Sequence, residues 1–266
     1  MSLPGDDELT RKRAWLIQLG VEPYGPIHAL QSELVQWRQQ DLIEDTLLLL
    51  EHTPVITLGR RADRAHILAT PQSLESEGIV VHQTERGGDV TYHGPGQLVG
   101  YPILRLRSYR IGASDYMHRL EEVIIRTLAN YGLVAHRRER EIGVRVGGNM
   151  IAAFGVRIKR GVTLHGFALN VCPNMLHWSL IVPCGITDAS VTSMAVEMRS
   201  APPMSVVRQH LVSHFETLFD LKLVPTTLDR LGEPAMQTTV PHEREPTGHR
   251  GHADYATTPT QRSPST

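Results

Sequence analysis

Residues 142–171 read IGVRVGGNMIAAFGVRIKRGVTLHGFALNV. Three β-rich runs lie in this stretch, at positions 142–146, 150–158 and 162–171. The runs are separated by Gly147-Gly148 and by Arg160-Gly161, pairs that fit two-residue hairpin turns. The stretch therefore predicts an antiparallel meander of three strands, around which the rest of the fold is built.

Amphipathic helices are predicted on both sides of this meander. In residues 115–131 the apolar side chains recur at helical spacing, with Ser114 or Asp115 available as the N-cap and Gly132 as the stop. The same spacing predicts helices at 28–39, opened by Pro26, and at 204–219, and short apolar runs predict strands at 14–20, 46–50 and 55–58. This mixture indicates an α+β domain, with a mainly antiparallel sheet and packed helices.

We expect one folded domain, at residues 14–225. The first 13 residues are polar and are expected to be loose. Residues 226–266 are rich in Pro, Thr, His and charged residues and have almost no apolar periodicity, which predicts a disordered tail. No internal repeat is present.

The overall composition excludes several classes of protein. The 27 Lys and Arg residues balance 28 Asp and Glu residues, so no global charge favours nucleic acid or an anionic membrane. No apolar run approaches the roughly 20 residues that span a bilayer, and the N-terminus lacks the apolar region of a secretory signal. We therefore expect a cytoplasmic monomer that binds neither nucleic acid nor membrane.

A glycine-rich segment, RGGDVTYHGPGQ at residues 86–97, is the densest functional signal. Glycines let a backbone pass close to a ligand, and the Arg, Thr, Tyr and His side chains among them supply donors and a wall. The segment matches neither a dinucleotide-binding nor a P-loop pattern. A glycine-rich hairpin with incidental polar groups explains its composition equally well.

Cys184 is the candidate nucleophile, because it stands next to glycine and before residues 189–198, which could be helical. The positive end of a helix dipole favours the thiolate over the thiol. A lone cysteine is more often a small buried hydrophobic residue. Cys172, which ends an apolar strand and has no evident activating neighbour, is read in that way.

The segment TLHGFALN at residues 163–170 breaks the period-two pattern of a strand at His165-Gly166. Glycine in a strand can mark close approach by a ligand, and histidine there could hold a proton. A core histidine beside a bulge is the alternative. Two arginine groups, Arg60/Arg61/Arg64 and Arg105/Arg107/Arg110, would suit an acidic protein carrier if they border the pocket.

Together, segments 86–97, 163–170 and PCGI at 183–186 resemble the lipoyl(octanoyl) transferase family in order and spacing. The resemblance runs from about residue 51 to residue 193 and on through the last predicted helix. It implies a biotin/lipoate protein ligase-like fold. It also implies transfer of an octanoyl group from octanoyl-acyl-carrier-protein to a lysine of lipoyl domains, such as those of 2-oxoacid dehydrogenases and the glycine-cleavage H protein.

The resemblance also implies which residues form the site. Cys184 would accept the acyl group, with His165 or His93 assisting proton transfer, and no metal or cofactor would be needed because the incoming thioester is already activated. The resemblance places the following residues along the acyl pocket: Arg86, Gly87, Gly88, Asp89, Val90, Thr91, Tyr92, His93, Ala153, Phe154, Gly155, Gly166, Phe167 and Ala168.

One position departs from the family. The family has a lysine that lowers the cysteine pKa and handles protons, whereas this chain has Met150. Methionine cannot perform that role. The departure leaves open a catalytically impaired homologue that binds acyl groups or lipoyl domains. An ATP-dependent lipoate ligase of the same fold is a further alternative, against which both Cys184 and the missing lysine argue.

Overall fold

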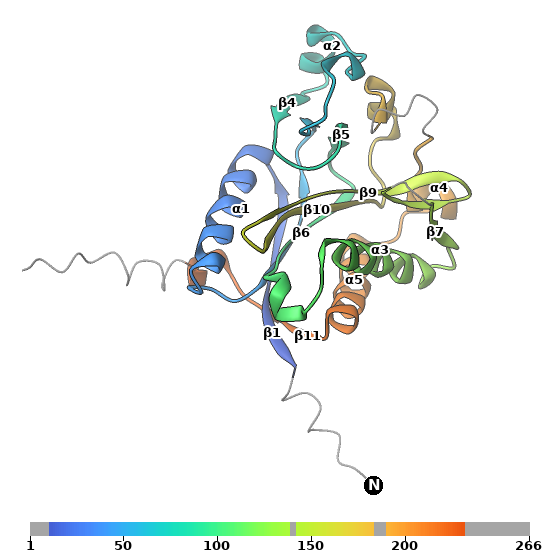
Figure 1. Cartoon of the computed structure of the whole chain (residues 1–266). Coiled ribbons are helices and arrows are strands. Elements are labelled where there is room, and N and C mark those ends of the chain that lie inside the picture. Colours follow the sequence, from blue (N-terminus) through green and yellow to red (C-terminus); the bar gives the residue numbers. More distant parts are fainter. Residues whose placement is uncertain (1–10, 139–141, 184–189, 232–266) are drawn as a thin grey trace, which may run out of the picture.

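The computed structural model describes residues 11–138, 142–183 and 190–231 (Figure 1). An eight-stranded sheet forms the centre, in the order β11-β1-β2-β6-β10-β9-β8-β7. Its strands are β1 (Lys12–Glu22), β2 (Thr46–His52), β6 (Gln97–Ile103), β7 (Ala135–Arg137), β8 (Val144–Val146), β9 (Asn149–Lys159), β10 (Val162–Asn170) and β11 (Leu221–Pro225).

The predicted meander is confirmed as β8, β9 and β10, which pair in antiparallel fashion. Both connecting turns have two consecutive residues with positive φ: Gly147 and Gly148 at 55° and 90°, Arg160 and Gly161 at 51° and 81°. Positive φ at both central residues is what a type I′ turn requires, and this turn matches the twist of the flanking strands. The meander continues through β10 onto β6 and β2, again antiparallel.

One edge of the sheet is parallel. β1 pairs in parallel with β2 and with β11. Parallel neighbours need a crossover connection, and α1 (Tyr24–Gln39) supplies it between β1 and β2. The helix begins two residues before Pro26, which lies in the first turn, where its missing N–H is not required.

Helices cover both faces of the large sheet. α3 (Ala113–Ala129) and α5 (Met204–Phe219) pack on one face together with Leu47 and Leu49, and α1 packs on the other with Leu48 and Leu50. In Figure 1 the sheet accordingly lies between α1 and the α3–α5 pair. Burial on both faces explains why β2 and β6 are apolar without alternation.

Several helix boundaries differ from the prediction: α1 begins at Tyr24 and not at residue 28, and α3 ends at Ala129 and not at residue 131. α3 begins at Ala113 with Gly112 as its N-cap, and the carboxylate of Asp115 accepts a hydrogen bond from the Gly112 N–H at 3.4 Å. Asp115 therefore lies inside the first turn of the helix and is not its N-cap. In residues 190–198 the helix is short, α4 (Met194–Met198), because Val191 and Thr192 are bonded in extended form to Met150 of β9.

A smaller sheet, in the order β4-β3-β5, stands at one end of the molecule (Figure 1). It consists of β3 (Val55–Leu58), β4 (Val80–Gln83) and β5 (Val90–His93), with α2 (Pro71–Ser76) beside it. The short 3-10 turns are η1 (Arg64–His66), η2 (Leu106–Tyr109) and η3 (Met175–Leu180).

The described chain continues beyond β11. The Thr226 N–H donates to the Leu16 carbonyl at 2.9 Å, and a helical turn at 228–231 buries Leu231 against the α1 side of the core. The remainder of the predicted tail, 232–266, lies outside the described residues. Within the described ranges, every helix is too short or too polar to cross a bilayer.

Candidate functional site

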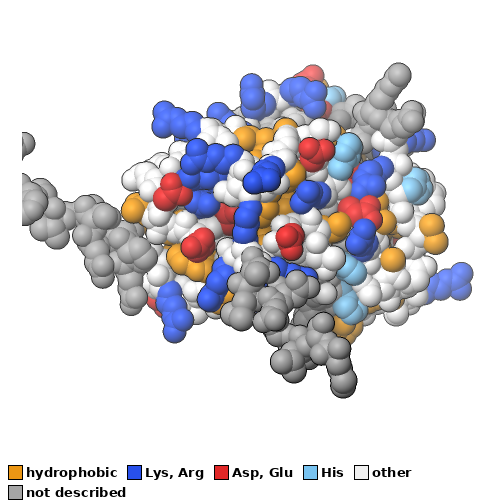
Figure 2. Space-filling view, turned by 60° about the horizontal axis from the view of Figure 1, so that its bottom comes forward, with side chains coloured by type: hydrophobic (Ala, Val, Ile, Leu, Met, Phe, Trp, Pro, Cys, Tyr) orange, Lys and Arg blue, Asp and Glu red, His pale blue; other side chains and the backbone are white. Residues whose placement is uncertain are grey.

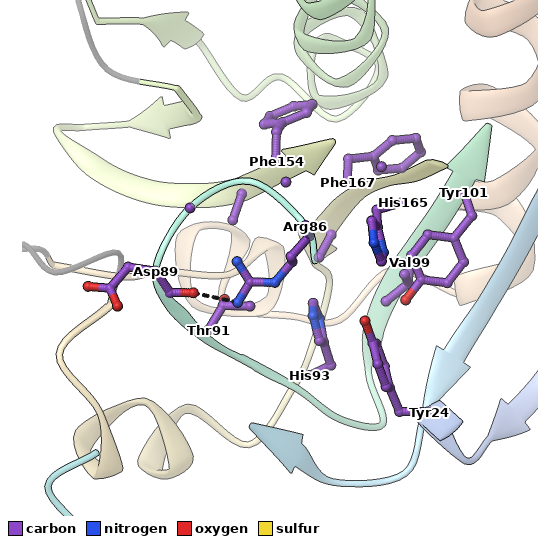
Figure 3. A pocket seen from close by; sticks show the side chains of 15 residues that line it. Tyr24, Arg86, Asp89, Thr91, His93, Val99, Tyr101, Phe154, His165 and Phe167 are labelled. Carbon is purple, nitrogen blue, oxygen red and sulfur yellow. Dashed lines mark hydrogen bonds between the residues drawn. The ribbon is translucent and has the colours of Figure 1, made fainter. Parts of the chain in front are cut away.

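A narrow pocket with a cavity volume of about 50 Å³ lies where the small sheet meets the centre of the large sheet (Figure 3). Residues from the loop before β5, from β5, β9 and β10 form most of its wall, and α1 and β6 add Tyr24, Val99 and Tyr101. The remaining lining residues are Arg86, Gly88, Asp89, Thr91, His93, Ala153, Phe154, Gly155, His165, Gly166, Phe167 and Ala168. The fold thus brings two of the three sequence motifs, 86–97 and 163–170, to one cavity.

Arg86 holds the glycine loop in place. Its guanidinium donates to the Thr57 hydroxyl at 3.0 Å, to the Thr57 carbonyl at 2.7 Å, and to the carbonyls of Gly87 and Asp89 at 3.0 and 2.6 Å. A planar group with several rigid donors suits this arrangement of acceptors. Arg86 lines the pocket as predicted, but two of these contacts tie the loop to β3 and the other two hold the loop in shape.

The two faces of β5 have different surroundings. Thr91 and His93 face the pocket, whereas Val90 and Tyr92 belong to the apolar cluster behind it, because side chains alternate along a strand. The Tyr92 hydroxyl bonds to His177 Nδ1 at 2.6 Å. Tyr92 and Val90, predicted as pocket residues, therefore lie outside its lining. Gly87 also lies outside it and donates its N–H to the Val156 carbonyl at 3.3 Å.

Glycines permit close packing around the cavity. Gly155 and Gly166 are direct partners on β9 and β10. A Cβ at Gly155 would stand 3.0 Å from Arg86 Cδ, and a Cβ at Gly166 would stand 2.0 Å from the Gly100 carbonyl oxygen. The first glycine admits the loop onto β9, and the second lets β10 lie against β6.

His93 is buried and neutral. Its Nδ1 bonds to Gln97 Oε1 at 2.7 Å, while the Gln97 amide nitrogen donates to Tyr92 O and to Asn170 Oδ1. This network assigns the proton to Nδ1 and leaves the lone pair on Nε2. Burial, with a further contribution from His52, lowers the pKa of His93 to about 3.

His165 is held in an unusual backbone conformation. Its φ is 60°, its N–H donates to Gln31 Oε1 at 3.1 Å, and its side chain is 2% exposed. Within the described part of the chain neither ring nitrogen has a hydrogen-bond partner. Burial lowers the pKa of His165 to about 3, although nearby Glu85 opposes the shift. The ring is therefore a neutral imidazole in the pocket wall.

Cys184 lies outside the described residues, as do Gly185 and Ile186 of the third motif. The chain on either side of positions 184–189 is anchored. On one side the Val182 N–H donates to the His66 carbonyl at 2.8 Å; on the other the Met150 N–H donates to the Ser190 carbonyl at 2.8 Å. Met150 itself is 4% exposed and packs in an apolar cluster with Tyr92 and Trp178.

Cys172, the second cysteine, differs from its prediction. Cys172 was expected to be buried but is exposed, because it follows the end of β10, where the chain leaves the sheet. Partial desolvation, together with Glu51, raises the pKa of its thiol. The predicted burial is therefore wrong, and among the described residues the thiol has no neighbour that would favour its thiolate.

The two arginine groups lie in different places. Arg60 and Arg61 are exposed, and their backbone N–H groups donate to the Arg86 and Gly88 carbonyls of the glycine loop, so they border the pocket region. Arg105 is buried and paired with Asp41 at 2.8 Å. Arg107 borders a polar surface pocket with Lys159 and Arg160. Figure 2 shows the molecule turned by 60° so that the bottom of Figure 1 comes forward, and on this face Lys and Arg predominate over Asp and Glu.

Comparison with known proteins gives a consistent result. The family model described as the lipoyl protein ligase A/B catalytic domain matches residues 23–216. A protein named octanoyltransferase from Alkaliphilus metalliredigens is 46% identical over 212 residues, which is 79% of this chain and 97% of that protein. Another octanoyltransferase, from Chloroflexus aggregans, is 48% identical over 209 residues, covering 77% and 95%.

Solved structures show a similar fold. A bipartite lipoate protein ligase from Thermoplasma acidophilum superposes with a TM-score of 0.64 at 17% identity, covering 85% of this chain and 91% of that one. Lipoate-protein ligase A bound with ATP gives a TM-score of 0.63 at 16% identity, covering 86% and 94%. At these identities the likeness concerns the fold.

Proposed function

Because the chain belongs to the lipoyl protein ligase A/B family and is similar to octanoyltransferases over 77–79% of its length, we propose that it transfers an octanoyl group from octanoyl-acyl-carrier-protein to a lysine of lipoyl domains. The observation that carries the proposal is the pocket formed by the glycine loop and the β9–β10 pair. Phe154, Phe167 and Ala168 give it apolar walls suited to an alkyl chain.

The reaction consists of two acyl transfers. The Cys184 thiolate attacks the thioester carbonyl, the bond to the carrier sulfur breaks, and the carrier thiol leaves after taking up a proton. The lysine amine then attacks the acyl-cysteine, an amide forms, and the Cys184 sulfur is released as the amine loses a proton. Both steps need a group that can accept or return a proton.

His93 and His165 are the candidates for proton transfer. Both line the pocket, and both are neutral, with a lone pair on a ring nitrogen. A base whose pKa is about 3 accepts a proton weakly. We therefore expect turnover to be slower than in a relative that has lysine at the Met150 position.

The partners follow from the same proposal. The acceptors are lipoyl domains, including those of 2-oxoacid dehydrogenases and the glycine-cleavage H protein, and the enzyme acts as a cytoplasmic monomer. The exposed Arg60 and Arg61 beside the glycine loop suit an acidic acyl carrier. The pocket requires no ATP, because the acyl group arrives as a thioester.

The test is the covalent intermediate. Incubation with octanoyl-acyl-carrier-protein should add one octanoyl group to the protein, as measured by intact mass. The adduct should be lost in Cys184→Ser and retained in Cys172→Ser, which is the matched control. Absence of an adduct on the parent protein, or its persistence in Cys184→Ser, would reject the covalent route.

The buried Met150 keeps a second candidate function open, a homologue that binds acyl groups but transfers them poorly. Adding a lipoyl domain to the isolated acyl-enzyme distinguishes the two. A transferase passes the acyl group to the domain, whereas an impaired homologue retains it on Cys184.

A further inference from the structure

Three potential metal ligands meet beside the pocket, on elements far apart in the sequence. His28 lies on α1, Glu85 lies between β4 and β5, and His165 lies on β10. His28 Nε2 is 2.9 Å from Glu85 Oε2, and His165 Nε2 is 3.9 Å from the same oxygen. The three ligand atoms all lie within 4.8 Å of one another.

His165 is the member of this cluster whose surroundings indicate a ligand. Its side chain is 2% exposed, and neither ring nitrogen has a hydrogen-bond partner within the described ranges. A buried polar atom without a partner has lost its hydration without compensation.

The two carboxylate oxygens of Glu85 have different neighbours. One carboxylate oxygen faces the two histidines, while the other lies 3.8 Å from the Arg157 guanidinium. A second contact of this kind orients a metal-binding carboxylate. Arg157 and Arg86 also place positive charge near His165, which opposes the binding of a cation and limits its affinity.

We propose that His28, Glu85 and His165 form a binding site for a divalent transition-metal ion of the zinc type. Two imidazoles and one carboxylate are a common protein ligand set for Zn²⁺, with water completing the tetrahedron. Imidazole nitrogens favour zinc, cobalt or nickel over calcium and magnesium, which prefer oxygen ligands.

Binding requires one local adjustment. The rings of His28 and His165 are stacked with an interplanar angle of 18° and centroids 5.4 Å apart. A metal ion lies in the plane of each ring that binds it, so one ring must turn. His28 can do so, because its side chain is 20% exposed, whereas His165 is enclosed.

Metal at this site would inhibit the enzyme. His165 forms part of the pocket wall, so a bound ion occupies the ring nitrogen that acyl transfer would use for a proton. This consequence rests on the proposed function, whereas metal binding itself does not. A binding measurement without any acyl substrate therefore tests the site independently.

The experiment titrates the chelator-treated full chain with Zn²⁺ by calorimetry, and with Co²⁺ by visible absorption, which reports tetrahedral coordination. The parent should bind one ion at this site, and His28→Ala and Glu85→Gln should each weaken binding by at least ~10-fold. His82→Ala is the control, because its ring lies 5.8 Å from that of His28 but outside the ligand set. It should bind like the parent.

Two outcomes would overturn the proposal: a parent that gives no tetrahedral Co²⁺ spectrum, or a His28→Ala variant that binds Zn²⁺ as tightly as the parent. Zn²⁺ should also slow transfer by the parent and leave His28→Ala less affected. If binding follows the expected pattern while transfer is absent, the metal site stands and the proposed function fails.

Discussion

Met150 occupies a position whose surroundings suit an uncharged side chain. It is 4% exposed, and its neighbours in the cluster include Tyr92, Trp178 and Ile181. Its backbone N–H donates to the Ser190 carbonyl and its carbonyl accepts from the Thr192 N–H, and these two residues follow Cys184 in the sequence by six and eight positions. A lysine here would have an ammonium group among apolar side chains, which lowers its pKa and costs stability.

Met150→Lys should therefore change activity and stability in opposite directions. We expect the single-turnover rate of octanoyl transfer to rise by ~10², the lower end of what general acid–base catalysis contributes. The free energy of unfolding, measured in urea, should fall by at least ~1 kcal/mol because a charge is buried. Met150→Leu, which keeps the volume, is the control and should leave the rate unchanged. An unchanged rate in the lysine variant would show that this position does not limit transfer.

The sequence predicted much of the pocket at the level of single residues, with informative exceptions. Gly155, Gly166 and their neighbours line it as expected, because local motifs carry the need for close backbone approach. Tyr92 does not line it, since strand alternation turns it away. Tyr24 and Tyr101 were missed: only tertiary packing brings them to the motif residues, so no local pattern could have identified them.

At the scale of elements, local patterns were sufficient for the meander and for the long helices. Turn pairs and apolar periodicity are properties of adjacent residues, and both hairpins and α5 appear where those patterns lie. The parallel pairing of β1 with β11 joins Lys12 to Leu221 across most of the chain. Such register depends on the assembled core, so no local pattern indicates it.

Close packing of β10 on β6 leads to a prediction about Gly166. Gly166→Ala would place a Cβ 2.0 Å from the Gly100 carbonyl oxygen and 2.8 Å from Pro102 Cδ. Strands must separate to admit it, so we expect the free energy of unfolding to fall by about 1–3 kcal/mol. Gly20→Ala is the matched strand control, because nothing lies within 4 Å of its added Cβ. Its unfolding midpoint should stay close to that of the parent, and equal midpoints in all three proteins would contradict the packing described.

At the scale of the whole molecule, folding keeps neutral two histidines of the pocket, His93 and His165, and also His52, whose ring lies 5.9 Å from that of His93. Burial lowers the pKa of His52 to about 4, and burial lowers the pKa of both His93 and His165 to about 3. In the unfolded chain each would titrate at its ordinary value of 6.5. Between the folded and unfolded pKa values, the unfolded chain therefore binds protons at these histidines and the folded protein does not.

The consequence is a loss of stability in mild acid. Above pH 6.5 these histidines are neutral in both the folded and the unfolded protein, and the stability is fully present. Below pH 6.5 the unfolded chain binds protons that the folded protein does not bind. Each such proton contributes at most about 1.4 kcal/mol per pH unit, so the three histidines together can remove up to about 4 kcal/mol per pH unit as the pH falls toward 4. Urea unfolding at pH 6.5, 6.0, 5.5 and 5.0, with chelator present, measures this slope before most carboxylates titrate.

His165→Asn identifies the source of that slope. Asparagine tolerates the positive φ of 60° at this position and keeps the N–H that donates to Gln31, so the fold should be retained. Removing one of three titrating groups should reduce the slope by about a third. His136→Asn, on an exposed strand residue, should leave the slope unchanged. A free energy of unfolding that does not vary between pH 6.5 and 5.0 would contradict this, because it would mean that the folded protein takes up the same protons as the unfolded chain. His93 and His165 would then be stronger bases than their burial implies, and better suited to proton transfer.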